Sequence, residues 1–147
     1  MSPGFVIRTD GAARGNPGPA SLGAALYDLG RPDARDPRAH PDASISEFLG
    51  VQTNNVAEYT AVIEGLALAK ELGARTVTLR SDSLLLINQL TGRYRVKSPH
   101  LQPLHRRAGS IAAGFERVSF EHVPREQNVE ADLLANEGVD RWLAGER

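Results

Sequence analysis

Four acidic side chains lie within short motifs of a type that supports hydrolytic chemistry. They are Asp10 in TDGAARGNPGP, Glu58 in TNNVAEY, Asp82 in RSDS and Asp132 in QNVEADLLAN. Carboxylates brought together repel one another, and their pKa values rise unless a cation holds them. Hard oxygen ligands in this number favour Mg²⁺ or Mn²⁺ over zinc, and two such ions about 4 Å apart can cleave a phosphodiester. The four acids predict a two-metal site if the fold brings them together.

Each acid also has a purely structural explanation. Asp10 and the glycine after it could form a tight hairpin turn, and Asp82 could cap the helix that follows. Glu58 stands three residues after Asn55, as in a capping box, and Asp132 would complement the dipole of the last helix. The four positions all fall where strands and helices meet, and such ends can converge at one edge of a mixed sheet. Taken together, the acids favour the metal site.

The segments that must position these acids alternate between strand and helix patterns. Period-two and helical apolar spacings, with Gly and Pro at the boundaries, define the elements. Strands are predicted at residues 5–10, 21–27, 45–52, 76–81 and 118–122, and helices at residues 55–72, 83–90, 99–114 and 127–143. This order predicts an α/β fold in which helices pack on a mixed sheet.

Two of the helices are predicted to bury an apolar face. In helix 55–72 this face holds Val56, Tyr59, Val62, Ile63, Leu66 and Ala69. In helix 127–143 it holds Val129, Leu133, Leu134, Ala135, Val139 and Trp142. Both faces are expected to pack on the sheet.

Length and composition fit one domain over residues 1–147. The segment 29–44, LGRPDARDPRAHPDAS, is predicted to be a mobile surface insertion because it is rich in Pro, Asp and Arg. The sequence has no cysteine, so disulfide and thiolate chemistry are excluded. It also has no apolar run long enough to span a bilayer, and we expect a soluble, cytoplasmic monomer without a membrane partner.

The charge is nearly balanced overall but unevenly distributed. The net charge is −1, yet residues 91–115 contain five basic side chains and no acid. These are Arg93, Arg95, Lys97, Arg106 and Arg107. Such a patch could contact a phosphate backbone, and it could equally be a solvated helix face.

The four motifs, in this order and on these elements, resemble the type 1 ribonucleases H, in the shorter branch that lacks a basic protrusion. The resemblance covers nearly the whole chain. It implies a five-stranded mixed sheet, with three antiparallel strands followed by two parallel ones and helices on both faces. It also implies endonucleolytic cleavage of the RNA strand of RNA/DNA hybrids without sequence specificity, leaving 5′-phosphate and 3′-hydroxyl ends. The implied cofactor is a pair of Mg²⁺ ions, with Mn²⁺ as a substitute.

The resemblance also assigns roles by position. Asp10 would bind both ions, Glu58 and Asp82 would complete one ion site, and Asp132 would complete the other. The implied substrate contacts are Gly11, Asn16, Asn54, Asn55 and Ser83. Amide side chains suit this task because they donate and accept hydrogen bonds, as the RNA 2′-hydroxyl does. Asn55 could alternatively cap helix 55–72.

The sequence departs from the family pattern in two places. Without the protrusion, Arg93, Arg95 and Lys97 are expected to contact the DNA strand. The segment before Asp132 is shorter than in relatives with a loop histidine. Arg125 is the first candidate for a cation beside the site, and His122 is the second. Arg125 could instead be a surface residue paired with Glu126, and His122 an ordinary residue at the end of a strand.

Two other functions are compatible with the motifs. One is a related metal nuclease that also cuts duplex RNA. The other is a noncatalytic hybrid-binding module, which would be expected to have lost an acid. All four acids are present, so the sequence favours the enzyme.

Overall fold

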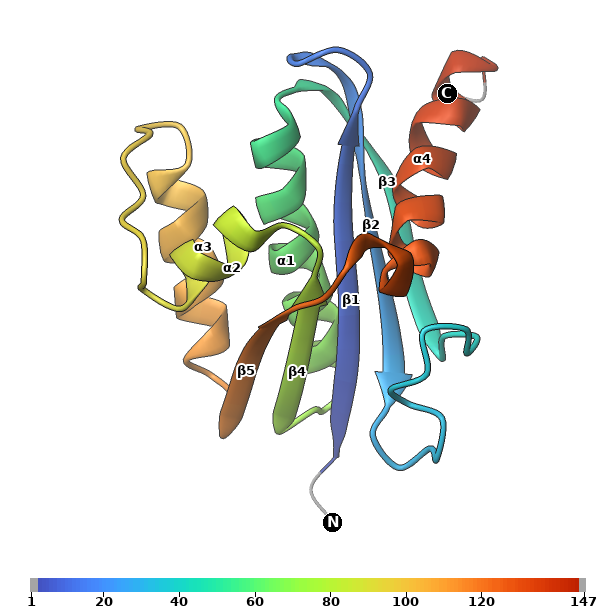
Figure 1. Ribbon diagram of the computed structural model, residues 1–147, viewed down its shortest axis with the longest axis vertical. Coiled ribbons are helices and arrows are strands. Elements are labelled where there is room, and N and C mark those ends of the chain that lie inside the picture. Colours follow the sequence, from blue (N-terminus) through green and yellow to red (C-terminus); the bar gives the residue numbers. More distant parts are fainter. Residues whose placement is uncertain (1–2, 146–147) are drawn as a thin grey trace.

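The structure, a computed structural model, describes residues 3–145 (Figure 1). One sheet contains all five strands, in the spatial order β3-β2-β1-β4-β5. The strands are β1 (Gly4–Ala13), β2 (Gly18–Asp28), β3 (Ala43–Gln52), β4 (Thr76–Ser81) and β5 (Arg117–His122). The helices are α1 (Asn54–Glu71), α2 (Leu84–Leu90), α3 (Gln102–Ala112) and α4 (Val129–Leu143), with the 3₁₀ turn η1 (Arg125–Gln127) before α4.

The sheet has the mixed topology predicted from the sequence. β1, β2 and β3 pair antiparallel, whereas β4 pairs parallel with both β1 and β5. Neighbouring residues of β2 show that both faces are covered, since Gly23 packs against α4 and Ala24 packs against Gly65 of α1. α2 and α3 join the α1 side through a common apolar core (Figure 1). The predicted five-stranded sheet with helices on both faces is confirmed.

Asp10 does not end its strand, as the sequence analysis assumed. β1 continues to Ala13, and Asp10 pairs with Gly23 of β2. The hairpin closes later, where the Arg14 amide donates to the Pro19 carbonyl at 2.8 Å. The Asp10-Gly11 pair therefore does not form a turn, and Asp10 is held in the ladder with β2 beyond the point where the pairing of β1 with β4 ends at Arg8.

The start of α1 differs from the predicted capping arrangement. Thr53 caps the helix, and its hydroxyl accepts a hydrogen bond from the Val56 amide at 3.2 Å. Asn55 is thus not the cap, and Glu58 does not take part in a capping box. The predicted buried face is otherwise correct, since Tyr59, Val62, Ile63, Leu66 and Ala69 are buried and Val56 packs against them.

The other three helices begin later than predicted. α2 begins after Ser83, whose hydroxyl accepts from the Leu86 amide at 3.2 Å, so Ser83 rather than Asp82 is the cap. α3 begins at Gln102, after a turn that contains Pro99. α4 begins at Val129 because η1 takes up the preceding residues.

The buried face of α4 is partly different from the predicted one. Val129 and Leu133 are 46% and 57% exposed, so their predicted burial is wrong. The prediction is correct for Ala135 and Val139, which are fully buried. The helix contacts the sheet through the small residues Ala131, Ala135 and Gly138, which lie against Gly23 and Ser21 of β2. Small residues let the two backbones approach closely. Leu134 and Trp142 are partly buried, and Trp142 stacks on Phe48 at 4.7 Å between ring centroids.

The segment 29–44 packs under the sheet edge around a buried arginine. Arg8 is 1% exposed and donates to the carbonyls of Arg35 at 3.2 Å and Gln127 at 2.6 Å. Burial lowers the pKa of Arg8 from its usual value. Ala34 is buried in an apolar cluster with Val6, Ala25 and Tyr27. Arg31 pairs with Asp42 at 3.1 Å. The segment is therefore bonded to the body of the protein, and its mobility stays a prediction.

Across residues 3–145, no helix is both long enough and apolar enough to cross a bilayer.

Candidate active site

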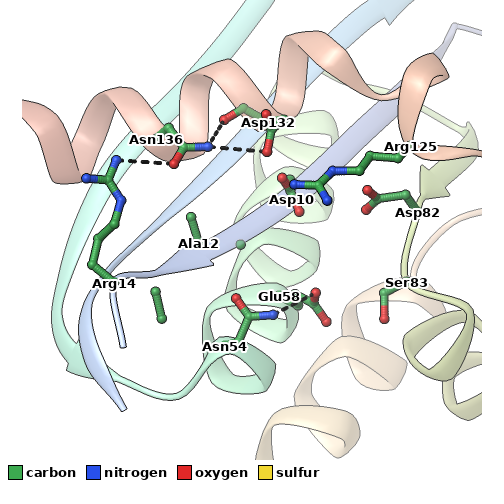
Figure 2. Close-up of a pocket in the computed structure, with 12 residues that line it drawn as sticks. Asp10, Ala12, Arg14, Asn54, Glu58, Asp82, Ser83, Arg125, Asp132 and Asn136 are labelled. Atoms are coloured by element: carbon green, nitrogen blue, oxygen red, sulfur yellow. Dashed lines mark hydrogen bonds between the residues drawn. The ribbon is translucent and has the colours of Figure 1, made fainter. Parts of the chain in front are cut away.

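All four acids line one pocket of about 580 Å³ between β1, α1, the end of β4 and α4 (Figure 2). The lining residues are Asp10, Gly11, Ala12, Ala13, Arg14, Asn54, Glu58, Asp82, Ser83, Arg125, Asp132 and Asn136. We call this the acidic pocket. The structure thus brings together acids that lie as far as 122 positions apart in the sequence, from Asp10 to Asp132.

Strand register places Asp82 beside Asp10. β1 and β4 run parallel with Arg8 level with Arg80, and Ser81 is the last residue of β4. Two residues further along each chain are Asp10 and Asp82, which therefore lie at the same level of the sheet. The parallel pairing of these strands is thus the reason that the two carboxyl groups share a pocket.

A glycine allows Glu58 to approach Asp10. Gly11 is buried, and a Cβ atom at this position would collide with the backbone of Ala57 and Glu58. Only a residue without a side chain lets the first turn of α1 lie this close to β1. Gly11 was predicted to contact substrate, but in the structure its clearest role is to bring α1 and Glu58 to the pocket.

Burial and mutual repulsion make the acidic pocket unfavourable for negative charge. Burial, the charge of Asp82 and a hydrogen bond with Asp132 raise the pKa of Asp10 to about 8. Burial also raises the pKa of Glu58 to about 7, with a further contribution from Asp82 that a hydrogen bond from Ser83 opposes. A pocket of this kind stabilises a bound cation, because the cation removes the repulsion between the carboxylates.

The donor set fits Mg²⁺ or Mn²⁺, although the side chains are not arranged as a finished site. Carboxylate oxygens are the ligands that both ions prefer. Among residues 3–145, however, no group of three or more Asp, Glu or His side chains is placed so that it could hold an ion. The acids would have to draw together around a cation, because burial and, to a smaller extent, the neighbouring carboxylates disfavour negative charge on Asp10 and Glu58.

The predicted asparagine contacts divide between two pockets. Asn54 lines the acidic pocket, and its amide donates to Glu58 Oε1 at 3.3 Å. Asn16 and Asn55 line a separate pocket of about 590 Å³, together with Thr53 and residues around α3. The Asn16 side-chain oxygen accepts from the Asn54 backbone amide at 3.0 Å. This bond ties the β1–β2 hairpin to the start of α1 and links the asparagines of the two pockets.

The predicted basic residues lie on the connection between α2 and α3. Arg93 and Arg95 line a third pocket, of about 520 Å³, with Tyr94 and Arg106. Lys97 is exposed but is not among the residues that line this pocket. Arg93, Arg95 and Lys97 therefore lie on the connection between α2 and α3 and do not line the acidic pocket.

The two candidates for a cation beside the acids have different positions. Arg125 lies in η1 and lines the acidic pocket near Asp10 and Asp82 (Figure 2). His122 ends β5, is exposed and is not a lining residue. The geometry therefore favours Arg125 over His122.

Sequence analysis missed two polar residues of the acidic pocket, Arg14 and Asn136. Asn136 stands four residues after Asp132, a spacing that places both on the same side of a helix. Arg14 is part of the TDGAARGNPGP motif quoted for Asp10. Both signals were present, but neither residue is acidic, and the search for metal ligands passed over them.

The sheet order and the placement of helices on both faces define the ribonuclease H-like fold. Residues 8–138 match the family model described as reverse transcriptase-like. A ribonuclease H of Polaromonas naphthalenivorans is 32% identical and is matched over 94% of this chain and 88% of its own length. The chain belongs to the type 1 ribonuclease H family.

More similar relatives support the same assignment. A bifunctional protein of Mycobacterium tuberculosis is 41% identical over 92% of this chain, which spans about a third (35%) of that relative's length. The ribonuclease HI of Halobacterium salinarum is 40% identical, over 89% of this chain and 62% of its own length.

Solved structures agree with these sequence matches. The N-terminal RNase H domain of the Mycobacterium tuberculosis protein superposes with a TM-score of 0.89 at 39% identity, covering 99% of this chain and all (100%) of that one. LC11-RNase H1 in complex with an RNA/DNA hybrid gives a TM-score of 0.83 at 36% identity, covering 95% of this chain and 99% of that one.

Proposed function

We propose that this chain is a divalent-metal-dependent endonuclease that hydrolyses the RNA strand of RNA/DNA hybrids. The observation that carries the proposal is the convergence of Asp10, Glu58, Asp82 and Asp132 on one pocket. Membership of the type 1 ribonuclease H family and the hybrid complex of LC11-RNase H1 support the substrate class. The products would be 5′-phosphate and 3′-hydroxyl ends, without sequence preference, and the enzyme would act as a cytoplasmic monomer.

The acids would hold two Mg²⁺ ions, or Mn²⁺ in their place. Asp10 is central, because it lies between Asp82, just after the end of β4, and Asp132 on α4 (Figure 2). Glu58 and Asp82 would complete one ion site and Asp132 the other. The chemistry that a pair of bound divalent ions supplies is activation of the attacking water and neutralisation of charge at the leaving oxygen.

The residues around the acids would orient the hybrid. Asn16, Asn54 and Asn55 would contact the RNA strand, where an amide can both donate to and accept from a 2′-hydroxyl. Arg125 would lie beside the scissile phosphate and stabilise its charge. Arg93, Arg95 and Lys97 would contact phosphates of the DNA strand, and Ser83 would position Glu58 through their hydrogen bond.

A panel of uniformly labelled substrates tests this function. Purified protein is incubated with RNA/DNA hybrid, duplex RNA, single-stranded RNA and duplex DNA, each with Mg²⁺, Mn²⁺ or chelator. Asp10→Asn protein serves as the control. We expect RNA cleavage in the hybrid only, dependent on metal and lost in the variant. Equal cleavage of duplex RNA would indicate the broader nuclease, and hybrid binding without cleavage would indicate a binding module.

A further inference from the structure

Asn136 links an acid of the pocket to a basic residue of the β1–β2 hairpin (Figure 2). Its side-chain amide donates to Asp132 twice, to the backbone carbonyl at 2.9 Å and to the carboxylate Oδ1 at 3.2 Å. Its side-chain oxygen accepts from Arg14 Nη2 at 3.2 Å. The three residues form a chain of hydrogen bonds along one side of the acidic pocket.

Arg14 determines which end of the Asn136 amide faces Asp132. A guanidinium only donates hydrogen bonds, so it must contact the amide oxygen and leaves the amide N–H groups for the carboxylate. The same Nη2 atom also donates to Asp140 Oδ1 at 2.7 Å. Asp132, Asn136 and Asp140 recur every four residues, so Arg14 is held against the face of α4 that carries Asp132.

We propose that Asn136 is a positioning residue for Asp132 and that Arg14 holds Asn136 in this role. The inference rests on the proposed function in treating Asp132 as a metal ligand. A hydrogen bond to Oδ1 restricts rotation of the carboxylate and occupies one of its lone-pair directions. The remaining lone pairs of the carboxylate would then be available to a cation shared with Asp10. Groups that orient a metal ligand in this way contribute strongly to metal affinity.

Two simpler roles for Asn136 make different predictions. If Asn136 only stabilised α4, its loss would lower the melting temperature and leave metal affinity unchanged. If it contacted the hybrid directly, its loss would raise KM and leave metal binding without nucleic acid unchanged. Metal binding by the free protein therefore separates the positioning role from both alternatives.

The experiment compares wild type, Asn136→Ala, Arg14→Ala and the double variant. Mn²⁺ binding to the free protein is measured by calorimetry, and kcat and KM are measured on hybrid at a fixed Mn²⁺ concentration below saturation. We expect Asn136→Ala to weaken Mn²⁺ binding and to lower kcat by about tenfold, with little change in KM. Arg14→Ala should act in the same direction but less strongly. In the Asn136→Ala background it should add nothing, because the two residues act through one path.

Glu137→Ala is the matched control. Glu137 is adjacent to Asn136 in α4, is exposed and pairs with Arg141 instead of lining the acidic pocket. It should leave Mn²⁺ binding and kcat unchanged. Arg14 is exposed on the hairpin, so Arg14→Ala protein is expected to fold even if Asn136→Ala does not, and it then tests the inference alone.

Wild-type Mn²⁺ affinity in Asn136→Ala, or in Arg14→Ala where only that variant folds, would overturn the inference. An increase in KM with unchanged kcat and metal binding would also overturn it. A failure of the positioning role can be distinguished from a failure of the proposed nuclease function. A wild-type protein that does not cut hybrid but binds Mn²⁺ in an Asn136-dependent way would refute the nuclease and leave the positioning role intact.

Discussion

The side-chain amide of Asn128 donates a hydrogen bond of 2.9 Å to the carbonyl oxygen of Thr9, the residue before Asp10. Asn128 is fully buried, and its backbone carbonyl accepts a hydrogen bond from the Asp132 backbone amide at 3.2 Å. One side chain thus sets the start of α4 against the part of β1 that carries Asp10. The relative position of Asp10 and Asp132 depends on this contact.

Asn128→Ala should therefore destabilise the protein and disturb the acidic pocket. Loss of the buried donor leaves the Thr9 carbonyl without a partner, at a cost of about 1–3 kcal/mol in the free energy of unfolding. Urea denaturation followed by circular dichroism measures this cost. Gln127→Ala is the control, because the Gln127 side chain is exposed and such substitutions change stability by about 0.5 kcal/mol or less. Equal stability of the two variants would contradict the prediction.

Apolar alternation and the Gly and Pro boundaries are local signals, and they were sufficient to predict the strands and a mixed sheet. The arrangement of three antiparallel and two parallel strands was implied by the resemblance to the family. The sequence was also sufficient to select the four acids, because each lies in a compact motif. It failed at the face of α4, where Val129 and Leu133 are exposed. Helical periodicity identified Ala135 and Val139 but not Ala131, which also packs on Gly23.

Contacts between segments that are distant in the sequence could not be predicted from local patterns. Nothing near Arg8 indicates that its guanidinium is buried, because its partners are carbonyls of Arg35 and Gln127. The pairing of Arg14 with Asn136 likewise joins a hairpin to a helix that follows it by more than 100 residues. Such contacts depend on the position and angle at which the helices pack on the sheet, and local patterns do not specify either.

Asp10→Asn should stabilise the protein in the absence of divalent metal while abolishing cleavage. The pKa of Asp10 is raised from 3.8 to about 8 in the folded state, mainly by burial and by Asp82. The stability that a protonated Asp10 provides is complete below about pH 4 and is lost as the pH rises to about 8. Asparagine does not ionise, so the variant should gain over wild type with increasing pH, by on the order of 3 kcal/mol at pH 9.

Thermal unfolding with chelator at pH 5 and pH 9 measures this gain. Excess Mg²⁺ should reduce it, because a bound cation removes the repulsion in wild type only. Glu126→Gln, an exposed acid in η1, is the control. The same difference in melting temperature between Asp10→Asn and wild type at both pH values would contradict the electrostatic account.

Arg95→Ala should make hybrid binding weaker and less dependent on salt. Arg95 lies beside Arg93 and the exposed Tyr94 on the connection between α2 and α3. A phosphate contact contributes a slope of about 0.7–0.9 to the dependence of log affinity on log salt. The variant should lose about this amount, measured by fluorescence anisotropy in an Asp10→Asn background that prevents cleavage.

Arg117→Ala provides the comparison for this measurement. Arg117 is exposed and is the first residue of β5, whereas His122 is the last. It removes the same charge without removing the proposed phosphate contact, so its salt slope should equal that of the parent protein. An unchanged slope in Arg95→Ala would mean that the basic connection does not contact the hybrid.

Arg125→Ala should lower kcat on hybrid by about 10²-fold, the typical effect of removing one group that stabilises charge in a transition state. Arg125→Lys should recover part of the loss, because it keeps the charge but not the planar geometry of the guanidinium. His122→Ala should leave kcat unchanged, since His122 lies outside the acidic pocket. If His122→Ala instead lowered kcat, while Arg125→Ala was fully active, proton transfer by His122 would replace charge stabilisation by Arg125 in the mechanism.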